Sequence, residues 1–507
     1  MKSLVVKSRE SVLFHKPGFV PLKAWLEDVR SMRRNGPWKL PMSMGDRVQM
    51  FFLGIIEKFS WLSDSLFISN PADVSPAYSL LVTYLHKQGI FDSFIERDTG
   101  YSGYFQYLFE KDMKKGNGVG AAIVRGQCSG KDPATALSKA IGEIIERTVT
   151  GLYDRNTMLR SASPEKMMEN DVPIVYPPRY HHFLDIQKKK FPELNHDRKK
   201  PILWVVGDNM VTRKKTYIPQ RMTSWASRER HESMLVHATT NGSAGYFTRS
   251  GAVLRGLLEI VQRDGFLVHW LTMIPPQIIR NDTLPEAAQE MIRKFEARGI
   301  SVSVLNTTAL LIPSVVAIGI STQAEIPQIV LSGGADTTFE GAIQSALDEM
   351  VMSIGMIHTE KSDTDRVFGK SDFEPFVSYL GKIERQLYWC GAEKVDRFKW
   401  FLSGEKTSYQ EACDFDVDCP RDDTSRLRGC LKKLRYLGHD YYPIVYYPTN
   451  PIQQSLGFFV AQVFIPKAFP LYLFEGYGTF ESERLQEFAR SRGVADWKLN
   501  PLPHGFP

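Results

Sequence analysis

The stretch SGKDPATALSKAIGEIIERTV, from Ser129 to Val149, predicts an amphipathic helix with a clear start. Asp132 is a good N-cap, and Pro133 suits the first helical position, where its missing N–H group costs nothing. One side of the helix is largely apolar at the helical period and is predicted to pack on a core. Its residues are Leu137, Ile141, Ile144, Ile145 and Thr148.

The opposite side of this helix is polar and carries Lys139, Glu143, Glu146 and Arg147. One interpretation is a solvated face on which Glu143 and Arg147, four residues apart, form an ion pair worth roughly 0.2–0.5 kcal/mol. The other is that the carboxylates hold a ligand. Taken alone, the segment favours the ion pair.

A second segment repeats the local pattern. RGLLEIVQRDGF, which begins at Arg255, contains EIVQR where the first helix contains EIIER. Its polar residues are Glu259, Gln262 and Arg263, and it follows a loop rich in Gly, Ser and Thr, TTNGSAGYFTRS.

A third helix is predicted in LSGGADTTFEGAIQSALDEMVM. Thr337 and Glu340 have the spacing of a capping box, and Glu349 ends an apolar stripe. Three loop-to-helix transitions therefore each lead to a carboxylate, and this repetition favours the ligand interpretation.

These parts suit a magnesium-bound nucleotide. Loop amides and helix N-termini attract phosphate, and carboxylates with phosphate oxygens are ligands that Mg²⁺ prefers. Arginines neutralise the remaining charge of a phosphate. A conventional P-loop is absent, since in GQCSGKD the glycines Gly126 and Gly130 are one residue too close and Asp132 replaces Ser or Thr.

The chain has 507 residues, of which 43% are hydrophobic and 24% are charged, and this composition is typical of a folded protein. The net charge of +6 is mild for this length and does not indicate a nucleic-acid-binding protein. The five cysteines form no CxxC pair, which suits a reducing compartment, although a zinc site between Cys413 and Cys430 stays open. The N-terminus lacks a signal peptide and no apolar run has the length of a membrane span, so we expect a cytoplasmic protein.

The order of predicted elements indicates an α+β fold, because strands and helices are mixed without a regular βα period. Residues 1–100 form an N-terminal region that carries no recognisable chemistry. Residues 101–507 form the main domain, and the charged residues 358–431 look like a helical insertion.

The three segments, in this order, resemble the YcaO family, whose members use ATP to activate peptide backbone amides. The late segment CLKKLRYLGHDYYPIVYYPTN with SLGFFVAQVFIPKAFPL is also similar to the family, so the resemblance covers roughly residues 110–507. It implies mixed sheets and helices around a nucleotide site.

The resemblance implies ATP and Mg²⁺ as cofactors. The implied metal ligands are Glu143, Glu146 and Glu259. The implied nucleotide contacts are Asn241, Arg147, Gln262, Arg263 and Glu349. Structural ion pairs remain an equal alternative for the two arginines.

The C-terminal LNPLPHGFP resembles the proline-rich tail of azoline-forming members, in which the tail enters the active site. The resemblance therefore places Pro501, Pro503, His504 and Pro507 in the catalytic machinery, with the terminal carboxylate and His504 assisting proton transfer. A frayed tail is the alternative.

The chain departs from the family pattern at several positions. Gly251 stands where the family has a glutamate that would bind magnesium, and Phe247 where it has a polar residue. Lys139 replaces a serine, Met352 a glutamine and Gly505 a proline.

The implied function is ATP-dependent cyclodehydration of Cys, Ser or Thr in a ribosomal precursor peptide to thiazoline or oxazoline. Two alternatives stay open: a YcaO enzyme that forms a thioamide or amidine, and a non-catalytic scaffold that activates a partner enzyme. The implied partners are the precursor peptide and a leader-binding protein of the ThiF-like type, which residues 1–100 would dock or partly replace. The family also allows a homodimer, and we expect neither nucleic acid nor membrane as a partner.

Overall fold

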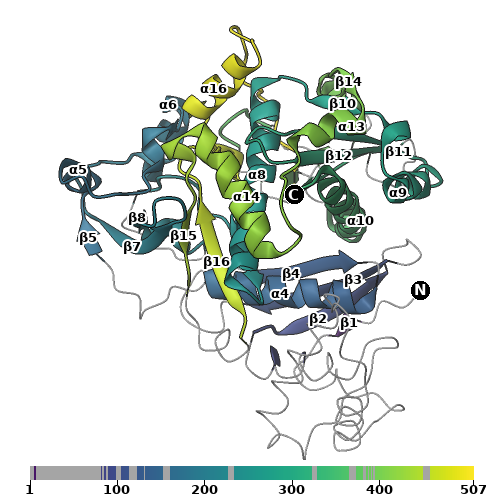
Figure 1. The fold of residues 1–507 in the computed structure, drawn as a ribbon, viewed down its shortest axis with the longest axis horizontal. Helices are drawn as coiled ribbons and strands as arrows, with labels where there is room; N and C mark the ends of the chain where they lie inside the picture. Colours follow the sequence, from purple (N-terminus) through teal and green to yellow (C-terminus); the bar gives the residue numbers. More distant parts are fainter. Residues whose placement is uncertain are drawn as a thin grey trace, which may run out of the picture. The chain divides into compact units, whose positions relative to one another are not determined.

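The fold is taken from a computed structural model of the chain (Figure 1). The described residues are 5–6, 82, 85–86, 90–98, 104–112, 123–130, 132–151, 160–225, 233–321, 328–364, 373–378, 380, 384–385, 388–389, 391, 394–448 and 457–506. They are grouped by their contacts into two compact units: residues 1–149 with 449–459, and residues 150–448 with 460–507. Most of residues 1–100 lie outside the described residues, so the division expected at residue 100 stays a prediction.

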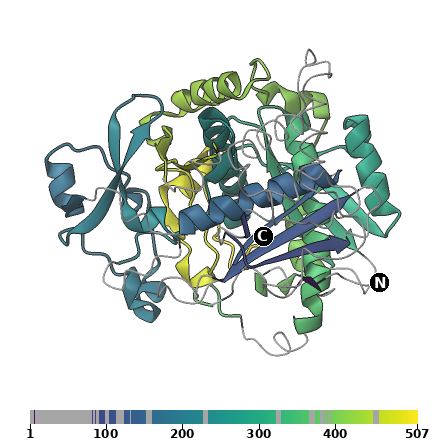
Figure 2. The ribbon, with the colours of Figure 1, turned by 90° about the horizontal axis from the view of Figure 1, so that it is seen from below.

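The first unit contains an antiparallel sheet and one long helix. The described strands run in the order β1 (Val5–Val6), β2 (Ser93–Asp98), β3 (Phe105–Asp112) and β4 (Ile123–Gly130), and helix α4 spans Pro133–Gly151. Helix α4 lies along this sheet (Figure 2). The approach is close, because a Cβ atom on Gly126 would lie 2.4 Å from the backbone nitrogen of Ile144.

Helix α4 confirms the interpretation of its sequence. The Thr135 N–H group donates to Asp132 Oδ1 at 2.8 Å, so Asp132 is the N-cap. All five residues of the expected apolar stripe are buried. The polar residues opposite are half-buried rather than fully solvated.

The second unit is built on two larger sheets. One has the strand order β13-β12-β11-β10-β14, and the other has the order β5-β7-β15-β16-β9 with β8 added beside β7. Strands β17 and β6 form a small separate pair. The strands are β5 (Arg160–Ala162), β6 (His181–His182), β7 (Ile202–Asn209), β8 (Lys215–Pro219), β9 (Ser243–Tyr246), β10 (Gln277–Ile279), β11 (Ile300–Asn306), β12 (Ser314–Ser321), β13 (Ile329–Ala335), β14 (Lys406–Thr407), β15 (Ile444–Tyr446), β16 (Phe459–Phe464) and β17 (Glu481–Ser482).

Helices pack on both of these sheets, which confirms the α+β class. The principal described helices are α5 (Pro164–Glu169), α6 (Asp185–Lys190), α7 (Gln220–Thr223), α8 (Arg249–Thr272), α9 (Glu286–Glu296), α10 (Phe339–Thr364), α12 (Val395–Phe398), α13 (Tyr409–Ala412), α14 (Asp423–Leu437) and α16 (Glu483–Ser491). Helix α10 covers β12 and β13, and α9 covers β11. In the described part of 358–431 short helices predominate, but its origin as an insertion stays a prediction. None of the helices in the described ranges has the length and apolar character that crossing a membrane requires.

Helix α8 is the centre of the second unit (Figure 1). It contacts β9 of one sheet, β12 and β13 of the other, and helices α14 and α16. Nineteen of its 24 residues are buried. This all-round burial explains why its sequence is apolar on more than one face.

The start of α10 differs from the prediction. The Gly341 N–H group donates to Thr338 Oγ1 at 3.2 Å, so the capping hydroxyl belongs to Thr338 and the capping box of Thr337 with Glu340 is wrong. Thr337 Oγ1 instead donates to Asp336 Oδ1 and accepts from Arg426 Nε. Two adjacent threonines offer the same cap chemistry, and tertiary contacts of Thr337 decide between them.

A buried ion pair ties α8 to α16. Arg484 donates through Nε and Nη2 to the two carboxylate oxygens of Asp264 at 2.9 and 2.6 Å. The Phe469 N–H group donates to Asp264 Oδ1 at 2.8 Å. Bidentate geometry and a third hydrogen bond compensate much of the cost of burying this carboxylate.

Breaking this pair should destabilise the second unit. Arg484→Met leaves the Asp264 carboxylate buried and unpaired, which should lower the free energy of unfolding by about 3–5 kcal/mol. Arg490→Met, an exposed arginine on the same helix, is the matched control and should change little. Urea unfolding of both variants measures the difference, and equal midpoints would contradict the assignment.

Candidate active site

Two glutamates of the second unit are held by backbone N–H groups. Glu259 Oε2 on α8 accepts from Gly242 N at 3.1 Å, and Glu349 Oε2 on α10 accepts from Gly333 N at 3.2 Å. Arg263 Nη2 lies 3.8 Å from Glu259 Oε1. Each carboxylate is therefore fixed in orientation through one oxygen atom.

Glu143 of the first unit is held in the same way. Its Oε2 accepts from Gln127 N of β4 at 2.5 Å, and its Oε1 pairs with Arg147. Arg147 Nη1 also donates to Arg125 O at 2.5 Å. The three donors precede their glutamates by 16 or 17 positions, so the repeated sequence pattern corresponds to a repeated contact.

These hydrogen-bonded carboxylates resemble pre-oriented metal ligands, because ligating carboxylates in proteins are themselves hydrogen-bonded. The two arginines form the ion pairs that the sequence left open, and a role toward a nucleotide stays a prediction for both. Glu146 is half-buried on the same turn of α4 as Glu143. Its part in metal binding also stays a prediction.

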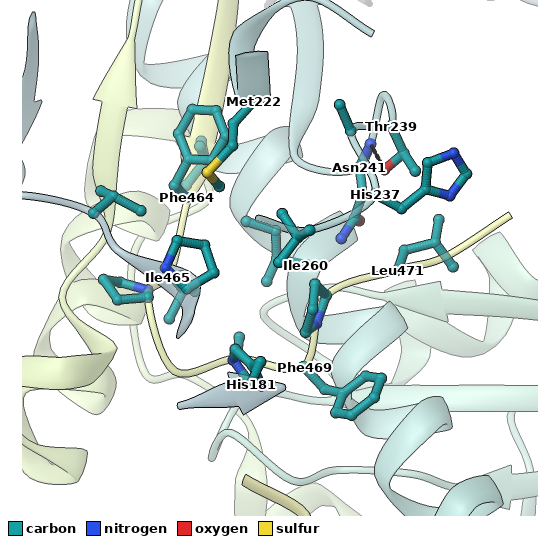
Figure 3. Close-up of a pocket in the computed structure, with 18 residues that line it drawn as sticks. His181, Met222, His237, Thr239, Asn241, Ile260, Phe464, Ile465, Phe469 and Leu471 are labelled. Carbon is teal, nitrogen blue, oxygen red and sulfur yellow. Dashed lines mark hydrogen bonds between the residues drawn. The ribbon is translucent and has the colours of Figure 1, made fainter. Parts of the chain in front are cut away.

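The side-chain oxygen of Asn241 has no hydrogen-bond partner among the described residues. This Oδ1 atom is buried, while the backbone N–H group of Asn241 donates to Thr239 Oγ1 at 3.1 Å. The side chain points toward the space between Ile260 and Leu471 (Figure 3). This buried amide oxygen next to the Gly242 loop can still accept a hydrogen bond or coordinate a metal ion.

Asn241 lines a pocket of about 80 Å³ in the second unit (Figure 3). Its walls are mostly apolar and come from α7, α8, β16 and the loop that follows β16. His181 also lines it, and burial lowers the pKa of this histidine to about 3. The imidazole is therefore neutral at physiological pH.

Mg²⁺ fits these residues. No group of three His, Cys, Asp or Glu side chains arranged as metal ligands occurs in the part of the chain that the structure describes. Cys413, Cys419 and Cys430 are free thiols in this part of the chain and belong to no such group. The suggested zinc site is therefore wrong for the described residues. Mg²⁺ needs only one or two carboxylates when phosphate oxygens and water complete its shell. Glu259 with the unpartnered oxygen of Asn241 has that donor chemistry.

The C-terminal tail is docked in the second unit, so the alternative of a frayed tail is wrong for residues 502–506. Asn500 bonds through its N–H group to Leu271 O at 2.9 Å. The indoles of Trp270 and Trp389 donate to the carbonyl oxygens of Leu502 and Pro503 at 3.2 and 2.9 Å. Pro503 and His504 are buried and Pro501 is exposed, whereas Pro507 lies outside the described residues.

The tail meets the predicted nucleotide contacts at Phe506. The guanidinium carbon of Arg263 lies 4.3 Å from the centre of the Phe506 ring. A Cβ atom on Gly333 would lie 2.4 Å from Phe506 Cζ and 2.7 Å from Gln262 Nε2. Four predicted regions, namely Glu259, the Gln262–Arg263 pair, the Glu349 anchor and the tail, therefore lie together.

His504 sits in a polar cluster that the sequence did not indicate. Its ring faces Arg385 and the Tyr472 carbonyl, and burial together with the Arg385 charge lowers its pKa well below the ordinary value. The ring is therefore neutral, and its role in proton transfer stays a prediction. Arg385 comes from a stretch rich in charged residues and Glu475 from the apolar stretch LYLFEGYG, and in neither does the sequence distinguish a buried charged group from a solvated one.

The Gly251 position is filled by other side chains. A Cβ atom there would lie 2.1 Å from the Tyr246 ring and 2.7 Å from Asp423 Oδ2. Arg255 stacks on Tyr246 at 3.5 Å and donates to Gly251 O at 3.1 Å. A glutamate at position 251 does not fit this arrangement. Gly505 is similar, because its Cβ would lie 2.9 Å from Trp389 Cδ1.

Gly251→Ala should therefore overpack the start of α8. The added methyl group should lower the free energy of unfolding by about 1–3 kcal/mol. Gly142→Ala on α4 is the control, because its nearest contact would be Phe458 Cζ at 3.6 Å and helical Ala is favoured over Gly by roughly 0.5–1 kcal/mol. Denaturant melts compare the two, and a Gly251→Ala protein as stable as the parent would contradict this packing.

Glu475 should make stability depend on pH. Burial raises the pKa of its carboxyl group to about 7, against 4.5 when exposed. The fold therefore favours the protonated form, and this stabilisation is present below pH 4.5 and is lost as the pH rises to 7, at about 1.4 kcal/mol per unit. Glu475→Gln should remove the loss, so its melting temperature relative to the parent should rise between pH 5 and pH 8. The exposed Glu481→Gln is the control, and parallel pH profiles for the parent and Glu475→Gln would contradict the assignment.

The chain is similar in fold to two proteins of solved structure. A heterocyclase structure in complex with substrate and cofactor is similar, with a TM-score of 0.65 and 15% identity over 94% of this chain and 61% of that one. A YcaO protein from Methanopyrus kandleri, bound with AMPPCP and Mg²⁺, gives a TM-score of 0.56 and 15% identity over 79% of this chain and 94% of that one.

An uncharacterised protein of Methanothermobacter thermautotrophicus is 25% identical over 278 residues, which are 53% of this chain and 66% of that protein. The chain thus spans less than two thirds of the length of both this relative and the heterocyclase. Residues 127–468, more than half of the chain, match the YcaO cyclodehydratases, described as ATP- and Mg²⁺-binding. The chain belongs to the YcaO family.

Proposed function

We propose that this protein is an ATP-dependent cyclodehydratase that converts Cys, Ser or Thr of a ribosomal precursor peptide to thiazoline or oxazoline. The observation that carries the proposal is the docked tail, whose Phe506 lies against Arg263, one helical turn from the anchored Glu259.

The proposed reaction has three steps: addition, phosphorylation and elimination of phosphate. The side-chain thiol or hydroxyl adds to the preceding amide carbon and loses its proton, and the former carbonyl oxygen becomes an oxyanion. That oxygen attacks the γ-phosphorus of ATP, and ADP leaves. The amide nitrogen then loses its proton as phosphate leaves with the oxygen, giving the C=N bond of the azoline. The protein has to align these oxygens and screen their charge.

Residue roles follow from the chemistry of each group. Glu143, Glu146 and Glu259 would hold Mg²⁺, which supplies charge neutralisation at the phosphates. Asn241, Gln262 and the two arginines Arg147 and Arg263 would contact the nucleotide, and Glu349 would support that site through its bond to Gly333. The tail residues Pro501, Pro503, His504 and Pro507 would complete the site next to the peptide.

The peptide would need a second recognition element. We infer a leader-binding partner of the ThiF-like type, docked by or partly replaced by residues 1–100. A cytoplasmic location suits a chain with free thiols such as Cys419 and Cys430. A homodimer is a further proposal, tested by light scattering.

One observation favours a second candidate, the non-catalytic scaffold. At Gly251 the family's glutamate is replaced by a stack of Arg255 on Tyr246 and a pair of Arg255 with Asp423 at 3.4 Å. A cationic side chain near a site for a cation weakens metal binding. Thioamide or amidine formation is the remaining alternative, and the docked tail argues against it.

Glu259→Gln tests whether the protein uses Mg-ATP at the proposed site. The amide keeps the shape and loses the charge, so phosphate release with Mg-ATP and precursor peptide should fall about 100-fold or more. Phosphate assay and peptide mass spectrometry are run with and without the partner protein, and the exposed Glu290→Gln is the control.

The parent protein should remove one water from the peptide for each ring. Exchange of oxygen for sulfur would indicate thioamide formation. Absence of ATP turnover under every condition, together with tight partner binding, would establish the scaffold instead.

A further inference from the structure

Arg385 is a fully buried arginine in the segment 358–431, outside the three motif helices. Its exposed fraction is 0%. Its Nη1 atom donates to Tyr472 O at 3.0 Å and lies 3.3 Å from His504 Nδ1, with a closer contact to His504 Nε2. Among the described residues, the hydrogen bonds of this guanidinium go to His504 of the tail and to Tyr472.

The cluster of Arg385, His504, Tyr472 and Glu475 leaves several buried polar atoms without hydrogen bonds, so stability alone does not explain it. Arg385 Nε and Nη2 have no hydrogen-bond partner among the described residues, and the carboxylate oxygen Glu475 Oε1 is 3.9 Å from Nη1. The Tyr472 hydroxyl is also buried and unpaired. Since hydrophobic side chains commonly replace buried ion pairs without loss of stability, a purely structural role does not explain an arginine here.

The position of Arg385 explains it better. Trp389, four residues later, donates to Pro503 O at 2.9 Å, so Arg385 and Trp389 grip two consecutive tail residues. Two residues beyond His504, the Phe506 ring lies over the guanidinium of Arg263. A shift of His504 would carry Phe506 away from Arg263.

We propose that Arg385 is a positioning residue that fixes the C-terminal tail in register against the predicted ATP site, through His504. This inference rests on the proposed function for its effect on turnover, but the docking of the tail is testable without it. It gives Arg385, within segment 358–431, a role in the predicted active site.

The test compares Arg385→Met and Arg385→Lys with Arg397→Met, an exposed arginine on α12. Arg385→Met should lower kcat for the peptide about 10- to 100-fold, the size expected for a small misplacement of reacting groups, while KM for ATP stays within about twofold. Arg385→Lys should recover part of kcat, and Arg397→Met should match the parent.

Hydrogen-exchange mass spectrometry of peptides covering 500–507 gives a second readout. Exchange of the tail should be faster in Arg385→Met and unchanged in Arg397→Met. If Arg385→Met fails to fold, Arg385→Gln takes its place. Parent-like tail exchange in a folded Arg385 variant would overturn the proposal whatever the activity.

A cycle of single and double variants with His504→Ala separates positioning from other effects. Because Arg385 is proposed to act through His504, Arg385→Met should cause no further loss of kcat in the His504→Ala protein. Multiplicative losses would overturn the proposal. If the parent makes no azoline, the proposed function fails, and tail exchange alone then decides whether Arg385 holds the tail.

Discussion

Helix α8 and its buried Asp264–Arg484 ion pair are the constraint on which the second unit depends. Arg484 Nη2 of α16 donates to Asp264 Oδ2 of α8 at 2.6 Å, which fixes the two helices against each other. The residue before Asp264 on α8 is Arg263. One helix therefore presents Glu259 and Arg263 to the candidate site and uses Asp264 to hold the chain that leads to the tail. Small movements of α8 would alter both together.

The repeated carboxylate contact shows how far the sequence could be interpreted. The N-cap at Asp132 and the apolar stripe of α4 followed from spacing and residue type, and both are confirmed. The roles of the three helix glutamates toward metal and nucleotide stay predictions. The hydrogen bonds from Gln127, Gly242 and Gly333 were not predictable, because they depend on which strand lies beside each helix. The wrong cap at Thr337 has the same origin, since a contact with Arg426 is long-range.

The tail cluster marks the limit of prediction from sequence. The resemblance pointed to Pro503 and His504, but nothing in the sequence identified Arg385 or Glu475 as their neighbours. Arg385 lies in a charged stretch and Glu475 in an apolar one, and the sequence does not show that the fold buries both groups within 3.9 Å of each other. The departure at Gly251 is explained by the structure, in which the Tyr246 ring occupies the space that a side chain at position 251 would need.

The central claim is that the amide oxygen of the peptide is transferred to phosphate. A precursor peptide labelled with ¹⁸O at the carbonyl preceding the modified Cys, Ser or Thr tests it directly, in the presence of Mg-ATP and the partner protein. The account predicts that the released inorganic phosphate carries the label in proportion to the rings formed, as measured by mass spectrometry. Ring formation with unlabelled phosphate, or no ring formation at all, would contradict it.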